Sequence, residues 1–134
     1  MLSLLHIENI AVIECSDISF NRGFNVLTGE TGAGKSIIID SINAVLGERT
    51  SKELVRTGSA KASVTAEFRI NNSAFDSMLE ELGIEPEADG TLLIRRTIGA
   101  DGKNTCRING IPVTVSMLKT VGRELINIHG EHGS

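Results

Sequence analysis

The stretch GETGAGKS, residues 29–36, decides the fold of this chain. It satisfies every fixed position of the phosphate-loop pattern G-x-x-x-x-G-K-[ST]. Residues 24–28 (FNVLT) before it predict a short buried strand, and residues 35–46 after it predict a helix. Strand, glycine-rich loop and helix in this order are the context that the motif requires, so we expect it to bind the phosphates of a nucleotide.

Each fixed position of the motif has a physical role. The glycines permit backbone angles that are closed to other residues, so several N–H groups can turn toward one anion. The helix that follows adds free N–H groups and the positive end of its dipole. Lys35 is expected to reach the β- and γ-phosphates, and Ser36 to place its hydroxyl on Mg²⁺. The predicted nucleotide-binding residues are Gly29, Glu30, Thr31, Gly32, Ala33, Gly34, Lys35, Ser36 and Ile37.

The composition is that of a single globular domain. Of the 134 residues 40% are hydrophobic, and the formal net charge is -4 with no run of Lys and Arg, so composition gives no support for nucleic-acid binding. Cys15 and Cys106 have no CxxC spacing and no nearby His, which predicts buried free thiols in a reducing cytoplasm. No signal peptide and no membrane-spanning segment is expected.

Hydrophobic periodicity predicts the remaining elements. Residues 2–20 predict two strands with Asn9 at their turn, and a change of apolar phase predicts a bulge near Ser16-Asp17. Strands are also expected at 63–70, 92–98, 104–108 and 111–113, with Asn109-Gly110 as a hairpin turn. Helices are expected after caps at Asn72 or Ser73 and at Thr114 or Ser116, with a helical turn near 52–55 and a short apolar strand at 126–132.

Hydrolysis needs more than a phosphate loop, because acidic residues must hold Mg²⁺ and water must be oriented. Asp40 ends an apolar run but lies on the predicted helix, so it is interpreted as a surface residue. His6 is interpreted as structural. His129 and His132 flank Glu131 at the chain's end, where a nucleotide-site loop is favoured over a metal site. The catalytic carboxylate pair is therefore expected outside this chain.

Four stretches resemble the RecN family of bacterial DNA-repair proteins, which are SMC-like ABC-type ATPases. Residues 27–37 resemble its phosphate loop, with Glu-Thr where most SMC relatives have Asn-Gly. Residues 2–9 resemble the first strand of SMC-type heads, and residues 46–58 resemble their arginine-loop segment, with Arg56 at the arginine. Residues 127–132 resemble a His-Gly-Gln-His motif, in which Glu131 stands at the Gln of the Q-loop.

The resemblance implies an α/β P-loop NTPase fold. Residues 1–134 would form the N-terminal lobe of a split ABC/SMC-type ATPase head, with a mixed sheet and an antiparallel β-subdomain. The implied cofactors are ATP and Mg²⁺. Lys35, Arg56 and Glu131 would be catalytic, and Ser36 and Glu131 would approach the metal. The family's coiled coil, signature motif, Walker B pair and switch His are absent from this sequence, so the chain alone is expected to be inactive.

The resemblance also implies partners and a role. The partners would be the C-terminal lobe of the same head, a second head in a nucleotide-sandwiched dimer, and DNA through the full-length protein, with no membrane contact. The role would be DNA double-strand-break repair and recombination in the cytoplasm, at the nucleoid. A GTPase is disfavoured because DxxG and NKxD motifs are missing. The alternative that stays open is a nucleotide-binding interaction module, or another P-loop NTPase with no role in DNA repair.

Overall fold

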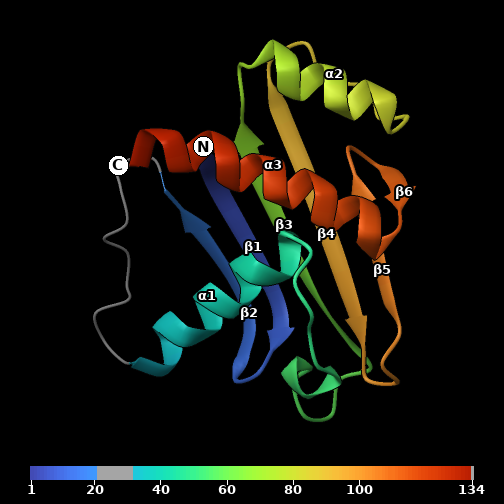
Figure 1. Cartoon of the computed structure of the whole chain (residues 1–134). Helices are drawn as coiled ribbons and strands as arrows, with labels where there is room; N and C mark the ends of the chain where they lie inside the picture. The colour runs from blue at the N-terminus through green and yellow to red at the C-terminus, as the bar shows by residue number, and fades with distance from the viewer. Residues whose placement is uncertain (21–31, 134) are drawn as a thin grey trace.

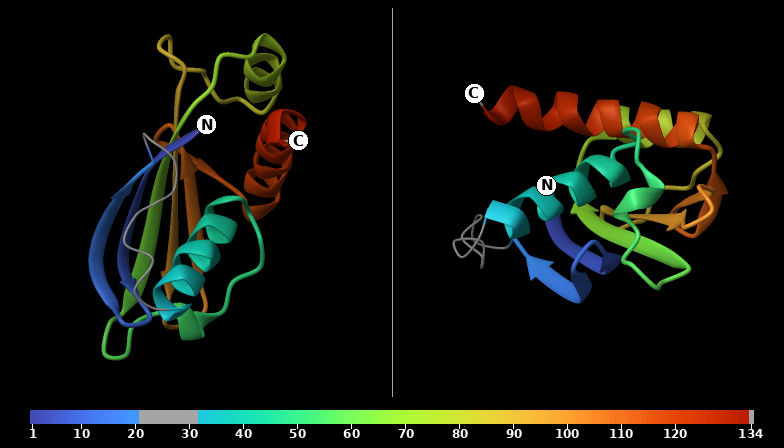
Figure 2. Two further views of the ribbon diagram at one scale, coloured as in Figure 1. Left: turned by 90° about the vertical axis from the view of Figure 1, so that its left-hand side faces the viewer. Right: turned by 90° about the horizontal axis from the view of Figure 1, so that it is seen from below.

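The described part of the chain forms a six-stranded sheet with helices α1 and α3 packed on one of its faces (Figures 1 and 2). The computed structural model describes residues 1–20 and 32–133, and the side chains of residues 1–20 and 34–128. Its strands are β1 (Leu2–Ile10), β2 (Ile13–Ser19), β3 (Lys61–Arg69), β4 (Thr91–Gly99), β5 (Asn104–Ile108) and β6 (Ile111–Val113). Its helices are α1 (Gly32–Val45), the 3₁₀ turn η2 (Lys52–Leu54), α2 (Ser73–Glu81) and α3 (Val115–Gly133).

The strands lie in the order β2-β1-β3-β4-β5-β6. Every pairing among the described residues is antiparallel. Each predicted strand within residues 2–20 and 61–113 is therefore confirmed. The strand predicted at 24–28, on which a mixed sheet would depend, lies outside the described residues.

The bulge predicted near Ser16-Asp17 is wrong, although the alternation of buried and exposed residues changes phase both in β1, between Ile7 and Ile10, and in β2, between Ile13 and Ser16. The β1–β2 register runs without a shift, with His6 opposite Asp17. Asn9 is not at the turn but inside β1, where its φ of 56° is left-handed. After this residue the alternation of buried side chains in β1 shifts by one position, so that Ile10 rather than Asn9 is the next buried residue after Ile7. A left-handed non-glycine residue leaves little trace in a hydrophobic pattern, and Asn is among the types that tolerate it.

Alternation along the strands builds the core on the helix side of the sheet. Leu5 and Ile7 of β1 are fully buried, whereas His6 and Glu8 between them face the other side. Each fully buried aliphatic side chain contributes about 1.5–3 kcal/mol relative to an exposed one. The fully buried core also includes Ile18, Val64, Ala66, Ile94, Ile98, Ile108, Leu118 and Val121.

Local turn and cap chemistry ends the smaller elements as the sequence predicts. The Asn72 side chain accepts a hydrogen bond from Phe75 N at 2.9 Å and caps α2. Asn109 and Gly110 both have positive φ, 50° and 83°, as the two-residue hairpin between β5 and β6 requires. Thr114 Oγ1 accepts from Met117 N at 3.0 Å at the start of α3.

The end of the chain is helical, so the short strand predicted at 126–132 is wrong. α3 continues to Gly133, and its buried stripe is Leu118, Val121, Leu125 and Ile128. These positions follow the helical spacing of three and four residues. Ile126 and Ile128 imitate strand alternation, but Ile126 is 51% exposed because it lies off that stripe.

The carboxyl end of α1 is held by Arg96, a β4 residue that is 3% exposed. Its Nη1 donates to the carbonyl oxygens of Ala44 at 2.8 Å and Glu48 at 2.6 Å, and its Nε donates to Asn104 Oδ1 at 2.8 Å. α1 has no basic residue in its own last turn. The guanidinium therefore supplies both the donors and the positive charge that a helix carboxyl end lacks.

A glycine contact fixes the same end of α1 against α3. A Cβ added to Gly122 would lie 2.0 Å from the Leu46 carbonyl oxygen, and one added to Gly47 would lie 2.5 Å from the Lys119 Cα. Gly47 also has a φ of 92°, which favours glycine. The two backbones touch here because neither residue carries a side chain.

We expect Arg96→Lys to destabilise the fold by more than about 1.5 kcal/mol, because hydrogen bonds to a charged group contribute about 1.5–3 kcal/mol and lysine cannot reproduce the fork. Urea unfolding would measure the change in unfolding free energy. Arg95→Lys is the matched control, since Arg95 is the exposed neighbour on the other face of β4. Equal stability of the two variants would contradict the role of Arg96.

We expect Gly122→Ala to destabilise the fold although alanine is the better helix former. Helix propensity favours alanine by about 1 kcal/mol, whereas overpacking costs about 1–3 kcal/mol and here meets backbone atoms that cannot rotate away. Thermal unfolding of Gly122→Ala and of Arg123→Ala, at the exposed next position, would test this. A higher melting temperature for Gly122→Ala would show that the two helices do not touch as described.

Candidate functional site

The helix half of the predicted phosphate-binding element is present. α1 begins at Gly32, inside the glycine-rich motif, and runs for 14 residues. Gly29, Glu30 and Thr31 lie outside the described residues, as does the strand predicted before them, and only the backbone of Gly32 and Ala33 is described. The backbone of residues 32–34 therefore opens the helix, so the glycine-rich motif coincides with the positive end of the helix dipole.

Of the four side chains that follow the last glycine of the motif, at residues 35–38, the first two are exposed and the last two are buried. Lys35 and Ser36 are exposed, whereas Ile37 is 9% exposed and Ile38 is 1% exposed. α1 lies against one face of the sheet (Figure 2), and Ile37 and Ile38 belong to the core while Lys35 and Ser36 are exposed at the start of the helix. Ile37, predicted to bind nucleotide, can do so through its backbone N–H, since its side chain lies in the core.

The electrostatics of this helix start suit an anion. The first turn of α1 contains no acidic residue, so nothing there opposes a phosphate. Asp40 is exposed further along α1, which confirms its interpretation as a surface residue. Ser41 is buried with its hydroxyl donating to the Ile37 carbonyl oxygen at 2.8 Å, so it is satisfied inside the helix.

Arg56 lies on the segment that joins η2 to β3. Its backbone N–H donates to the Asn9 carbonyl oxygen at 2.8 Å, and Val55 forms a β-bridge with Ile10, so the segment is fixed to the end of β1. The Arg56 Nε atom is buried and has no hydrogen-bond partner among the described residues. Both η2 and the start of α1 lie at the lower end of the domain in Figure 1, and the left view of Figure 2 agrees.

Glu131, His129 and His132 lie on α3, and their side chains are not among those that the structure describes. They were expected at the end of a strand, so their backbone setting differs from the prediction. The end of α3 and the start of α1 lie at opposite ends of the domain in Figure 1. Glu131 and Lys35 thus lie on different helices, and the side chain of Glu131 is outside the part of the chain that the structure describes.

The sequence motifs did not predict one cluster of potential metal ligands, which consists of His6, Glu8 and Cys15. Cys15 is exposed, so its predicted burial is wrong, whereas Cys106 is buried as expected. Cys15 lies beside His6 and Glu8 across the β1–β2 pair. Hydrogen bonds to Asp17 and then to Glu8 raise the pKa of His6 above its ordinary value. The sequence lacked a signal because the partners become neighbours only through strand register.

The fold is shared with solved ATPase heads. A structure titled "Structural biochemistry of ATP-driven dimerization and DNA stimulated activation of SMC ATPases" superposes with a TM-score of 0.69 at 24% identity, covering 91% of this chain and 79% of that chain. The SMC head domain from Thermotoga maritima gives a TM-score of 0.60 at 22% identity, covering 89% and 41%. The predicted fold class, an SMC-type P-loop ATPase head, is therefore confirmed.

Residues 4–129 match the family described as "AAA domain", and the chain belongs to that family. Among curated proteins it is similar to the DNA repair protein RecN of Bacillus subtilis, with 47% identity over 133 residues, 98% of this chain and 23% of that protein. RecN of Haemophilus influenzae is 38% identical over 136 residues, 100% of this chain and 24% of that protein. The predicted RecN resemblance is confirmed, and the chain spans about a quarter of these relatives' length.

Proposed function

We propose that this chain is the Mg-ATP-binding lobe of an SMC-like ATPase that acts in DNA double-strand-break repair. One observation carries the binding function: α1 starts within the phosphate-loop motif at Gly32 and exposes Lys35 and Ser36 in its first turn. The repair role is supported by the similarity to proteins named DNA repair protein RecN. A phosphate loop alone would equally serve a nucleotide-binding interaction module.

The described residues fit ATP and Mg²⁺. The helix start offers the positive end of the helix dipole and a lysine with no carboxylate in the first turn, which suits the phosphates of a nucleotide. In this proposal the backbone of residues 29–34 holds the phosphates, Lys35 neutralises the β- and γ-phosphates, and Ser36 ligates Mg²⁺. The bound nucleotide supplies the phosphoanhydride bond and the metal supplies charge neutralisation.

We further propose that Arg56 turns toward the nucleotide. Its buried Nε without a partner among the described residues supports this, because an unsatisfied guanidinium nitrogen is costly and an anion would satisfy it. Its segment lies at the same end of the domain as the start of α1 (Figure 1). In the same proposal Glu131, at the position of the Q-loop residue, approaches Mg²⁺ from α3.

Turnover would need a further segment. We propose that the C-terminal lobe of the same head supplies the missing acidic pair, that a second head caps the nucleotide, and that DNA is bound through the full-length protein. The chain's span of about a quarter of its RecN relatives supports this division. No helix among the described residues has the length and apolar character needed to cross a membrane. The expected cellular place is the nucleoid.

We expect Lys35→Ala to weaken Mg-ATP affinity by at least about tenfold, because a hydrogen bond to a charged group contributes about 1.5–3 kcal/mol. Titration calorimetry on the folded variant would measure it. Lys119→Ala, another exposed lysine on a helix, is the control and should bind as the unmodified chain does. Affinity within twofold of the unmodified chain for Lys35→Ala would refute the phosphate-loop assignment.

We expect this chain alone to show no ATP turnover, because no Walker B carboxylates are present to orient water. A turnover assay would compare the chain, the chain mixed with the C-terminal segment, and that mixture carrying Lys35→Ala or Arg56→Ala. Turnover should appear in the mixture and be lost in both variants. Turnover by the chain alone that Lys35→Ala removes would make Asp40 and Glu131 the residues to examine.

A further inference from the structure

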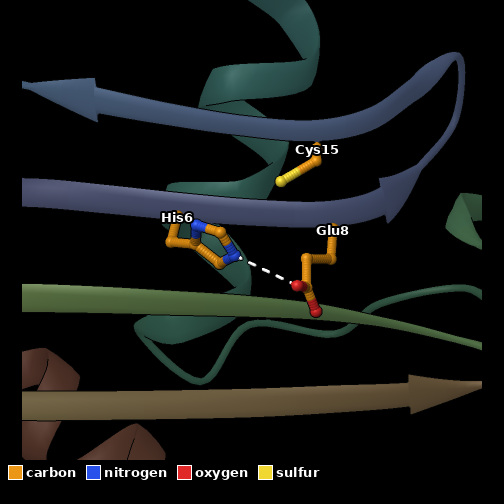
Figure 3. Close-up of side chains that lie close together, drawn as sticks. All are labelled: His6, Glu8 and Cys15. Atoms are coloured by element: carbon orange, nitrogen blue, oxygen red, sulfur yellow. Dashed lines mark ion pairs between the residues drawn. The ribbon is translucent and has the colours of Figure 1, made fainter.

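Three side chains with metal-ligand chemistry converge on the side of the sheet that faces away from α1. His6 and Glu8 come from β1 and Cys15 from β2, and their ligand atoms all lie within 4.8 Å of one another (Figure 3). His6 and Glu8 are partly buried and Cys15 is exposed. None of these residues belongs to the nucleotide site, and the helices cover the other face of the sheet.

Strand register explains why the three residues meet. Glu8 lies directly opposite Cys15 in the antiparallel pair, and His6 is two residues before Glu8 on the same face. Leu5 and Ile7 point from the opposite face of β1 into the core, so His6 and Glu8 must lie on the face that points away from the core. The backbone therefore fixes a nitrogen, an oxygen and a sulfur ligand side by side.

The hydrogen bonds around His6 select the nitrogen that is left for a metal. His6 Nδ1 bonds to the Asp17 carboxylate, and His6 Nε2 faces Glu8 Oε2 at 3.2 Å. A carboxylate on one imidazole nitrogen fixes the ring and its tautomer so that the other nitrogen can ligate a metal. Asp17 is thus placed as the supporting partner of His6 rather than as a ligand.

Glu8 is oriented in the same manner. The Ser63 hydroxyl donates to Glu8 Oε1 at 3.1 Å, which leaves Oε2 to face His6. Ser63 is itself 5% exposed, so this support comes from a fixed position on β3. Both ligands on β1 therefore have one atom anchored and one atom turned toward the same point.

The spacing suits a small tetrahedral ion. Ligands about 2.0–2.1 Å from zinc in tetrahedral geometry lie about 3.4 Å apart, and a sulfur at about 2.3 Å lies about 3.6 Å from them. The His6–Glu8 separation of 3.2 Å already meets the first value. The Cys15 side chain is exposed and free of the core, so its rotation can supply the remaining approach.

We propose that His6, Glu8 and Cys15 form a zinc-binding site, with Asp17 and Ser63 orienting the first two ligands. Zinc accepts each of these donor types, a histidine nitrogen, a carboxylate oxygen and a cysteine sulfur, and a fourth position would stay open to water. The ion would cross-link β1 to the edge strand β2. A simple histidine–carboxylate network would need no cysteine, so Cys15 separates the two interpretations.

Cobalt(II) is the probe that reports the cysteine directly. Metal-free chain, kept reduced with a thiol-free phosphine, would be titrated with cobalt(II) and followed by absorbance, then back-titrated with zinc(II). We expect one equivalent to give a sulfur-to-cobalt charge-transfer band that zinc removes. Absence of the band in the folded chain would overturn the proposal.

Three single substitutions test whether the sulfur-to-cobalt charge-transfer band comes from the His6–Glu8–Cys15 cluster. Cys15→Ser should abolish the band and weaken zinc affinity by at least tenfold in calorimetry, whereas Cys106→Ala, at the other cysteine, should keep both. Asp17→Asn should keep the band while weakening affinity about 10–100-fold, as loss of a supporting carboxylate does. A band that survives Cys15→Ser, or zinc affinity unchanged in that variant, would overturn the site. Circular dichroism would confirm that each variant is folded.

Discussion

The contact of the Arg96 guanidinium with the carboxyl end of α1 is the interaction on which the rest of this domain depends. α1 carries the phosphate-loop motif at its other end, so its placement on the sheet decides where Lys35 and Ser36 point. Burial of an arginine is tolerable when its donors are satisfied, and here two carbonyl oxygens and an Asn side chain accept from it. The close approach of Gly122 to Leu46 fixes the same helix end from the opposite side.

Most of the fold could be predicted because most of its signals are local. The alternation of residues 63–70, the Asn72 cap and the Asn109-Gly110 turn each lie within one short window, and each predicted element is present. The wrong predictions arise where the local pattern of apolar residues indicates a different structure from the one that forms. Asn9 has a left-handed backbone, which shifts the alternation of buried and exposed residues in β1. Ile126 and Ile128 alternate as strand residues do, but Ile126 lies outside the buried face of helix α3 and is exposed.

The candidate sites differ in how far the sequence could predict them. The phosphate loop is one contiguous motif whose chemistry is visible in eight residues. The roles of Arg96 and Cys15 depend on partners more than five residues away: packing of α1 on the sheet brings the Ala44 carbonyl to Arg96, and strand register brings Glu8 to Cys15. Cys15 was expected to be buried because most free cysteines are, yet the face of β2 on which it lies is the one that the helices leave uncovered.

The sheet also separates the two sites chemically. α1 packs on the face that carries Leu5 and Ile7, whereas His6 and Glu8 project from the other face of the same strand. A buried aliphatic layer therefore lies between the nucleotide site and the His6–Glu8–Cys15 cluster. The charge of a bound nucleotide would act on the zinc ligands only across this apolar layer, and the charge of a zinc ion would act on the phosphate loop only across it. The residues of each proposed site would contact their own ligand directly. The proposed nucleotide and zinc sites thus depend on different residues, and loss of one proposed affinity would not imply loss of the other.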